Sequence, residues 1–165
     1  INVSGKNKIP MEDLRALLSD LGFKNLQTYI QSGNIILESD LDKTEICKKI
    51  KIGIKEKFGF DVSVIGRTIK EWEKIIDKYP FSIENEKIVA FTFLNKASNE
   101  KTIAIKNIGE DKYKIVNDIV YLYCPSGFGK TKLTNNIIEK KLNVIATTRN
   151  LRTTLKLLEL AKSKF

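Results

Sequence analysis

The sequence contains no histidine, and its only two cysteines, Cys47 and Cys124, lie far apart. Histidine is the usual general base for serine and cysteine nucleophiles, so its absence excludes histidine-dependent mechanisms and leaves carboxylates, lysines and tyrosines for proton transfer. Neither cysteine has a partner at metal-ligand or redox-motif spacing. We therefore expect free thiols, no metal site and no cofactor.

Long apolar runs are also missing. None approaches the roughly 18–20 residues of a membrane-spanning helix, and the beginning of the sequence, INVSGKNKIP, lacks the basic-then-apolar order of a signal peptide. With 42% hydrophobic and 30% charged residues, the 165-residue chain has the composition of a soluble globular protein. The sequence thus predicts a cytoplasmic protein with no membrane partner.

Acidic residues are fewer than basic ones, 20 against 29, which gives a formal net charge of +9. A basic surface attracts polyanions because phosphates that are neutralised by the protein release their counterions. Nearly all the cations are lysines, however, and lysine-rich surfaces also serve solubility. A surface for nucleic acid and a merely solvated basic surface both stay open at this point.

The first part of the chain predicts a helix, two strands, a second helix and a third strand. Pro10 suits the first turn of a helix, Asp42 and Glu45 form a capping box for the second helix, and Gly22 and Gly59 suit helix ends. The residues expected in these elements, in order, are 10–21, 25–30, 34–38, 42–58 and 61–65. This order is a βαββαβ unit without its opening strand, so we expect a strand-forming segment ahead of Ile1.

The second part repeats that order after a connecting helix. Thr68 and Glu71 form a capping box for the connecting helix, and Pro80 closes it. The pattern then predicts a strand, a helix, a hairpin of two strands, a helix and a strand, at residues 87–94, 98–106, 113–116, 119–123, 129–142 and 144–147.

The predicted fold class is therefore α+β, with two tandem ferredoxin-like (βαββαβ) halves and a C-terminal helix. The first half lacks its opening strand. The expected organisation is a first half, a connecting helix and loop, a second half and a packing helix, at residues 1–67, 68–86, 87–148 and 149–165.

Four stretches, in order, resemble the motifs of one bacterial family. They are INVSGKNKIPMEDLRALL, TYIQSGNIIL, PSGFGKTKLTN and ATTRN with a following leucine helix. Along essentially the whole chain they are similar to the family labelled domain of unknown function 1697. Members usually have a strand ending in Leu-Leu-Arg-Gly before the first motif and continue the last as Arg-Asn-Trp-Asn-Thr, where this chain has Arg149-Asn150-Leu151. The resemblance implies a two-part α+β architecture in a soluble bacterial protein and no established reaction.

The stretch CPSGFGKT, residues 124–131, invites comparison with a nucleotide-binding P-loop. That loop requires GxxxxGK[ST], and only Gly129, Lys130 and Thr131 fit, because Cys124 stands at the first glycine position. The preceding strand belongs to a hairpin rather than to a parallel sheet. The stretch therefore does not predict an ATPase or GTPase. Two interpretations remain: a capped turn, or an anion site at the N-terminus of the helix expected from residue 129.

Two other loops offer similar chemistry. The first is a polar turn ahead of the first helix, and the second opens the last helix with a cap and a fixed cation that suits a carboxylate or phosphate. Equally, Arg149 could pair with an acid and serve structure. The anion-binding candidates are Ser4, Gly5, Lys6, Asn7, Ser126, Gly127, Gly129, Lys130, Thr148, Arg149 and Asn150.

Aromatic residues alternate along two neighbouring strands, so each pair faces one side of the sheet. Exposed rings in this position stack bases in RNA-recognition folds. The same rings could instead be buried in the core. The stacking candidates are Phe91, Phe93, Tyr121 and Tyr123.

Three functions follow from these features. The first is a binding module for a phosphorylated or carboxylated small molecule at glycine-containing loops before helices. The second is single-stranded nucleic-acid binding through the aromatic strands. The third is a histidine-independent enzyme acting on a phosphorylated substrate, for which the sequence identifies no catalytic residues.

Overall fold

The computed structural model describes residues 8–165, which fall into two compact units. One unit runs to Ile69 and includes Leu157–Phe165, and the other is Lys70–Lys156. Among the described residues, no helix is both long and apolar enough to cross a lipid bilayer. Four of the anion-binding candidates lie outside the described residues: Ser4, Gly5, Lys6 and Asn7.

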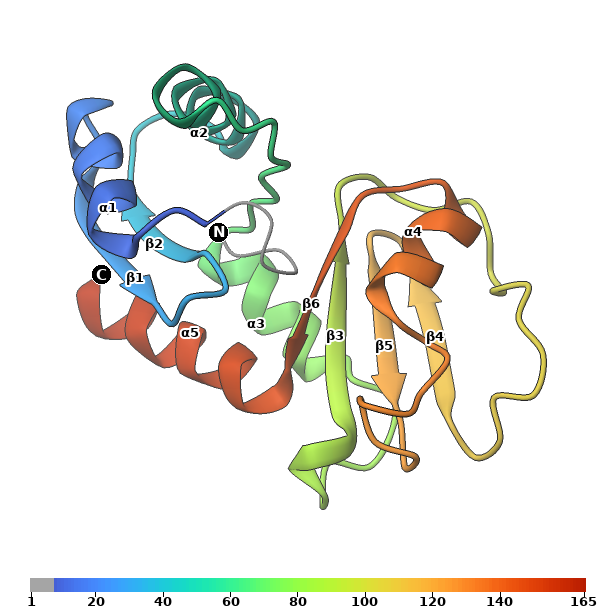
Figure 1. Ribbon diagram of the computed structural model, residues 1–165. Coiled ribbons are helices and arrows are strands. Elements are labelled where there is room, and N and C mark those ends of the chain that lie inside the picture. The colour runs from blue at the N-terminus through green and yellow to red at the C-terminus, as the bar shows by residue number, and fades with distance from the viewer. Residues whose placement is uncertain (1–7) are drawn as a thin grey trace. The chain divides into compact units, whose positions relative to one another are not determined.

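The first unit pairs two helices with a two-stranded antiparallel sheet (Figure 1). Its elements are α1 (Met11–Asp20), β1 (Lys24–Tyr29), β2 (Asn34–Glu38) and α2 (Lys43–Phe58). The two helices and the sheet share one apolar core, in which Leu14, Leu18 and Ile54 are fully buried. The end of the chain belongs to this unit, because the Lys164 ammonium donates to the backbone oxygen of Asn25 over 3.1 Å.

Local signals set the ends of both helices. Pro10 is the N-cap residue of α1. The predicted capping box of α2 is confirmed: the Asp42 carboxylate accepts from the backbone N–H of Thr44 and Glu45, and these bonds lower the pKa of Asp42. Gly59 ends α2 with φ 74°, a left-handed conformation that glycine adopts without steric cost.

The strand predicted over residues 61–65 is wrong, because residues 59–68 form no regular element. A strand exists only where another backbone pairs with it. In the described part of this unit, pairing is confined to β1 and β2. Val62 is nevertheless buried in the core of the first unit, which explains the alternating apolar pattern that suggested a strand.

The second unit is built on a four-stranded sheet. Its elements are α3 (Ile69–Asp77, whose first residue belongs to the first unit), a 3-10 turn η1 (Glu86–Ile88), β3 (Val89–Leu94), β4 (Lys112–Val116), β5 (Ile119–Tyr123), α4 (Asn135–Leu142), β6 (Ala146–Asn150) and the start of α5 (Leu151–Lys164). The strand order is β4-β5-β3-β6, and every neighbouring pair is antiparallel. With the first unit, residues 8–165 thus contain five α-helices and two antiparallel sheets, a mixed α+β fold.

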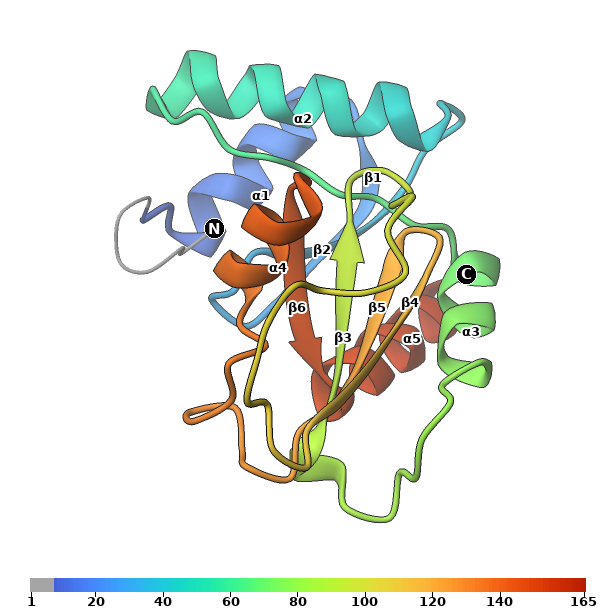
Figure 2. The same ribbon diagram turned by 90° about the vertical axis from the view of Figure 1, so that its right-hand side faces the viewer.

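One face of this sheet is covered by α4 and by the connection between β3 and β4 (Figure 2). The core on this face includes Leu94, Val120, Leu122 and Ile138. The helix predicted over residues 98–106 is wrong, because this connection is irregular.

The reason lies in the backbone hydrogen bonds of that connection. The N–H of Ser98 donates to the backbone oxygen of Asn117, and the N–H of Ile103 donates to the Tyr113 hydroxyl over 2.8 Å. Both partners belong to the β4–β5 hairpin. A helix over residues 98–106 would have used the N–H of Ile103 internally, and the contact with Tyr113 takes up that donor instead.

Candidate functional site

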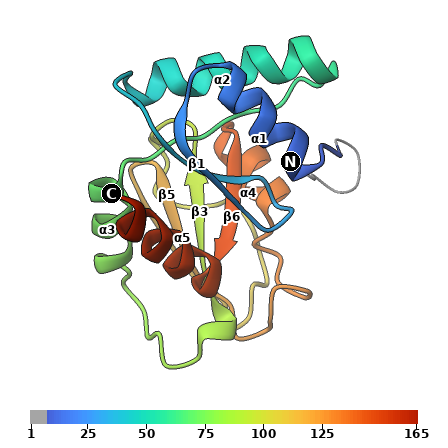
Figure 3. The same ribbon diagram turned by 90° about the vertical axis from the view of Figure 1, so that its left-hand side faces the viewer.

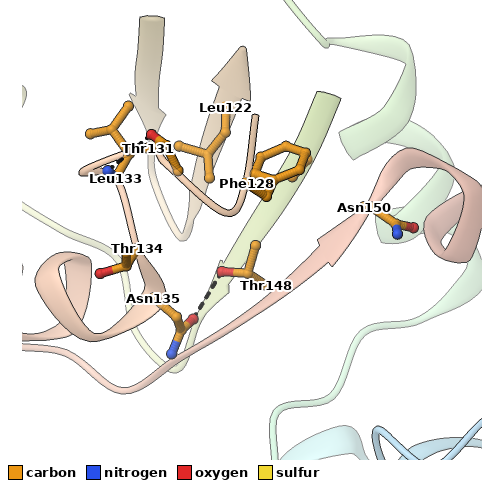
Figure 4. Close-up of a pocket in the computed structure, with 9 residues that line it drawn as sticks. Leu122, Phe128, Thr131, Leu133, Thr134, Asn135, Thr148 and Asn150 are labelled. Carbon is orange, nitrogen blue, oxygen red and sulfur yellow. Dashed lines mark hydrogen bonds between the residues drawn. The ribbon is translucent and has the colours of Figure 1, made fainter. Parts of the chain in front are cut away.

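A pocket of about 300 Å³ opens on the α4 side of the sheet, between the strands and the loop of residues 124–134 (Figure 4). Ala90 pairs with both Leu122 and Asn150 across the sheet, so the three side chains share one face. The loop and the first turn of α4 supply the other wall. The lining residues are Ala90, Leu122, Phe128, Thr131, Leu133, Thr134, Asn135, Thr148 and Asn150.

The loop is anchored by a carboxylate from the chain itself. The buried side chain of Asp111 accepts from the Ser126 backbone N–H over 3.1 Å and from the Ser126 hydroxyl over 2.6 Å. Burial alone would raise the pKa of Asp111, but the hydrogen bonds from Ser126 and Thr131 outweigh it and lower the pKa. The donors of Ser126, one of the anion-binding candidates, are thus already bound to an internal anion.

The helix expected from residue 129 begins only at Asn135, so this prediction is wrong at its start. Thr134 is the N-cap residue, and its hydroxyl accepts from the backbone N–H of Ile137. Gly127 has φ 85°, and its oxygen accepts from the N–H of Lys130 and of Thr131, which closes a turn instead of a helix. Gly129 and Lys130 are exposed on this loop and do not lead directly into α4.

The residues expected to open the last helix lie in a strand instead. Thr148, Arg149 and Asn150 belong to β6, where successive side chains point to opposite faces. Thr148 and Asn150 line the pocket, and the Asn150 side-chain oxygen caps α5 by accepting from the N–H of Thr153 over 2.8 Å.

Arg149 pairs with Phe91 on the other face of the sheet. Its guanidinium donates to the Thr147 hydroxyl over 2.6 Å and to the backbone oxygen of Thr148 over 2.9 Å. Burial lowers the pKa of this guanidinium. Strand alternation therefore separates Arg149 from the two pocket residues beside it in the sequence.

A chain of hydrogen bonds crosses one wall of the pocket. The Thr148 hydroxyl donates to the side-chain oxygen of Asn135 over 2.9 Å (Figure 4). Because that uses its single proton, Thr148 accepts from the Thr92 hydroxyl, 2.8 Å away. The amide nitrogen of Asn135 then donates to the backbone oxygen of Ala146 over 3.0 Å. These bonds fix the orientation of the Thr148 hydroxyl and the Asn135 amide.

Of the nine lining residues, Thr148 and Asn150 were among the anion-binding candidates of the sequence analysis, and the other seven were not. One signal was available for the α4 end of the pocket, since a threonine directly before an apolar helical run is a common N-cap. Ala90, Leu122 and Leu133 carry no such signal, because they are ordinary apolar core positions in the sequence.

The four stacking candidates lie on the opposite face of the sheet, where their rings contact residues of α3 and of the segment after it. Figure 3 shows α3 on this side of the sheet. Phe93 stacks on Trp72 with ring centroids 4.4 Å apart, and the Tyr121 hydroxyl donates to the backbone oxygen of Ile75 over 2.8 Å. Phe91, Phe93 and Tyr121 are at most 2% exposed, and Tyr123 is half-buried.

This burial follows from the composition of the covering segment. Trp72, Tyr79 and Phe81 bring three more rings, so aromatic packing replaces solvent on this face. A base can stack only on an exposed ring face. Three of the four stacking candidates therefore offer no surface to a nucleic acid in this fold.

The cysteine nearest the pocket is not an activated nucleophile. Cys124 is fully buried, and burial raises the pKa of its thiol to about 11. Nucleophilic chemistry requires the thiolate, which is a minor form at neutral pH when the pKa is so high.

Charge around the pocket is uneven. None of its lining residues is charged. Between residues 124 and 156, however, seven lysines and arginines stand against the single carboxylate of Glu139, so this stretch carries a net charge of +6. The Glu139 carboxylate itself accepts from the backbone N–H of Ala146 over 2.9 Å.

The fold and the pocket together define an α+β protein with a small, partly apolar cavity that is lined by neutral hydrogen-bonding side chains. By sequence, the chain belongs to the family described as "Protein of unknown function (DUF1697)", whose family model matches residues 1–121. Of the pocket residues, only Ala90 falls within that match. No curated protein matches the chain.

A solved structure resembles the whole chain. The conserved bacterial protein SP0830 from Streptococcus pneumoniae has a TM-score of 0.69 and 21% sequence identity to this chain. The match covers 98% of this chain and 93% of the other. At this identity the likeness concerns the fold alone.

Proposed function

We propose that the protein binds a small molecule that carries a carboxylate or a phosphate, and that the ligand occupies the pocket beside α4. The observation that carries this proposal is the balance of hydrogen-bonding groups in the pocket. Its side-chain acceptors are bonded within the protein, whereas several of its donors have no partner among residues 8–165. Such donors suit a ligand rich in acceptor oxygens.

A backbone N–H can only donate and a backbone oxygen can only accept, so bonds to the backbone show which side-chain atoms of the pocket are acceptors and which are donors. Asn150 presents its oxygen to the N–H of Thr153, so its amide nitrogen is left for a ligand. Thr134 accepts from the N–H of Ile137 and keeps its hydroxyl proton. Asn135 uses one amide proton on the oxygen of Ala146 and keeps the second. Among the described residues, no other partner accepts these three protons.

Two longer-range effects favour an anion at the same place. Thr134 and Asn135 form the N-terminus of α4, where the helix dipole contributes a partial positive charge. The exposed lysines of the loop, Lys130 and Lys132, add a positive field beside the pocket. Lys130, one of the original candidates, contributes to this field from the exposed side of the loop.

The proposal is tested by substituting Asn150 with aspartate. Asn150→Asp keeps the oxygen that caps α5 but replaces the amide donor by a second carboxylate oxygen. Asn117→Asp is the matched control, because it makes the same change in the β4–β5 turn, away from the pocket residues. Phenylacetate, hexanoate, phenyl phosphate and glycerol phosphate serve as probes in NMR titrations of backbone amides.

At least one acid should shift the resonances of Thr134, Asn135 and Thr148. Its affinity should fall at least about tenfold in Asn150→Asp, because a lost charge-assisted hydrogen bond and a new like charge each cost about that much. It should be unchanged in Asn117→Asp. If none of the four probes shifts these resonances, or if both variants bind equally well, the proposal is wrong.

We also infer a finer description of the fold. The order β4-β5-β3-β6, antiparallel throughout and with α4 crossing between β5 and β6, matches a ferredoxin-like sheet. On this interpretation the irregular connection of residues 95–111 takes the place of the first helix. A tandem arrangement of two such halves is part of the same proposal.

A further inference from the structure

We propose that Phe128 is a movable lid of this pocket. Its ring leaves the core of the second unit as a local event, and this movement exposes an apolar floor made of Ala90, Leu122 and Leu133. The proposal rests on the proposed function in that the lid controls entry to the same pocket. The movement itself can be measured without a ligand.

The apolar residues of the pocket are covered while the lid is closed. Ala90, Leu122 and Leu133 line the pocket but are at most 1% exposed. They belong to the apolar core of the second unit, and the half-buried ring of Phe128 packs against this core from the loop (Figure 4). A ligand can contact the three side chains only after a covering group has moved, and the Phe128 ring is the covering group that the loop supplies.

The backbone on both sides of Phe128 has little packed against it. Phe128 lies between Gly127 and Gly129, and a Cβ at either glycine would meet nothing within 4 Å beyond its chain neighbours. Glycine has the greatest backbone freedom, and small residues often absorb the backbone changes of a lid. The ring can therefore swing out with the loss of few contacts, at a lower free energy than unfolding of the unit requires.

Both ends of this loop are fixed, so the movement stays local. The Asp111 carboxylate accepts from the N–H and the hydroxyl of Ser126, over 3.1 and 2.6 Å. Thr131 is 7% exposed, and its hydroxyl oxygen accepts from the N–H of Leu133 over 3.1 Å. The N–H of Thr131 donates to the backbone oxygen of Gly127 over 2.9 Å. The lid is therefore the ring together with the short turn that carries it, residues 127–130.

Two other half-buried apolar side chains pack against the same core without these features. Tyr113 lies in β4, and its hydroxyl accepts from the N–H of Ile103 over 2.8 Å. Ile105 lies in the connection between β3 and β4 and has no glycine beside it. Ile105 is the matched control for Phe128, because truncation of either side chain removes apolar contacts from one and the same core.

The experiment places a reporter thiol on the floor of the pocket with Ala90→Cys in the full chain. Iodoacetamide labels the thiols under native conditions, and mass spectrometry of peptides measures the rate at each site relative to the urea-unfolded chain. Cys124 is the internal reference, because it is fully buried in the same core but does not line the pocket. Labelling through a local movement is insensitive to low urea concentrations, whereas labelling through unfolding accelerates with urea.

The floor thiol of Ala90→Cys should be labelled at least about tenfold faster than Cys124, at a rate that low urea concentrations do not change. Adding Phe128→Ala should raise the rate at the floor thiol by a further factor of about ten or more, while the rate at Cys124 changes only as much as the free energy of unfolding requires. Adding Ile105→Ala should leave the ratio of the two rates unchanged.

Equal rates at the two thiols, with the same dependence on urea, would overturn the lid. A fast floor thiol whose rate is unaffected by Phe128→Ala would overturn it as well, because another group would then cover the floor. If Ala90→Cys does not fold, Leu133→Cys carries the reporter on the same floor.

The outcomes also separate this inference from the proposed function. If the floor thiol is labelled only through unfolding while an acid probe shifts the resonances of Thr134 and Asn135, the lid is wrong and the proposed function stands. If the lid moves and no acid probe binds, the proposed function is wrong and the lid stands as a property of the loop.

Discussion

At the scale of single residues, one buried side chain keeps its charge and one β-branched residue has a left-handed backbone conformation. Both features have measurable consequences. Asp111 is a buried carboxylate that stays ionised because Ser126 and Thr131 donate to it. Ile30 is a β-branched residue with φ 50°, at the tip of the β1–β2 hairpin. Such a residue is a steric outlier in the left-handed region.

Removing the charge of Asp111 should weaken the fold in a pH-dependent way. A pKa that is lower in the folded than in the unfolded chain stabilises the fold above the unfolded value of about 3.9. That stabilisation is lost as the pH falls through the folded pKa. We expect Asp111→Asn to lower the free energy of unfolding by about 1–2 kcal/mol at pH 7.

Urea titrations between pH 7 and pH 3 measure this effect, and the difference between Asp111→Asn and the unmodified protein should shrink towards pH 3. Asp40→Asn, at an exposed loop position, should show almost no difference at any pH. A difference for Asp111→Asn that is the same at pH 7 and pH 3 would contradict the role assigned to its charge.

Relieving the backbone of Ile30 should stabilise the first unit. Asparagine tolerates the left-handed conformation, and the Ile30 side chain is 50% exposed, so little apolar burial is lost. We expect Ile30→Asn to raise the free energy of unfolding by about 1 kcal/mol in urea titration. Leu41→Asn, at a similarly exposed site without a positive φ, should not be stabilising. Equal effects of the two changes would show that strain at Ile30 is not the cause.

At the scale of elements, the loop before α4 shows how local and tertiary signals compete. The capping box at Asp42 and the glycine stop at Gly59 depend on neighbours within a few residues, and the sequence alone predicted both. The start of α4 was predicted six residues too early. Its loop is shaped by Asp111, a partner 15 residues away, and no local pattern announces that contact.

The two glycines of this loop should respond to alanine in opposite directions. Gly127 has φ 85°, so Gly127→Ala should lower the free energy of unfolding by about 1–2 kcal/mol. Gly129 has no positive φ, and a Cβ there meets nothing within 4 Å, so Gly129→Ala should be neutral or stabilise by up to about 1 kcal/mol. Thermal and urea unfolding of the pair measure the contrast. The same sign for both changes would show that the turn is not formed as described.

The alternation of side chains along β6 explains why the candidate site could be predicted only in part. The sequence analysis placed Thr148, Arg149 and Asn150 in a loop, where they were expected to bind one anion together. In β6 they face alternate sides, so two of them reach the pocket and Arg149 does not. The pairing of β6 with β3 decides this outcome, and such a pairing depends on residues more than 50 positions apart. Sequence periodicity within five residues cannot establish it.

At the scale of the whole molecule, the net charge of +9 is not accompanied by exposed rings on the aromatic strands, since Phe91, Phe93 and Tyr121 are buried. We therefore expect single-stranded RNA to bind only through the attraction between its phosphates and the basic surface, with release of counterions and without stacking of its bases. For three or more phosphate contacts, the affinity should fall at least about tenfold between about 50 and 200 mM salt.

Fluorescence anisotropy of a labelled oligonucleotide measures this dependence. Tyr123→Ala removes the half-buried ring of the aromatic face and should leave the affinity unchanged at both salt concentrations. Tight binding at 200 mM salt that is lost in Tyr123→Ala would restore base stacking as a function of this protein.

The division of the chain has a further consequence for biosynthesis. The second unit is one continuous segment, Lys70–Lys156, whereas the first unit includes residues from both sides of it, among them Leu157–Phe165. During translation, the two early helices and the hairpin can pack their shared core before the second unit is made, because that core contains no residue of Leu157–Phe165. The last residues of α5 can join the first unit only after Lys70–Lys156 has been synthesised, so the contact between the two ends of this unit forms last.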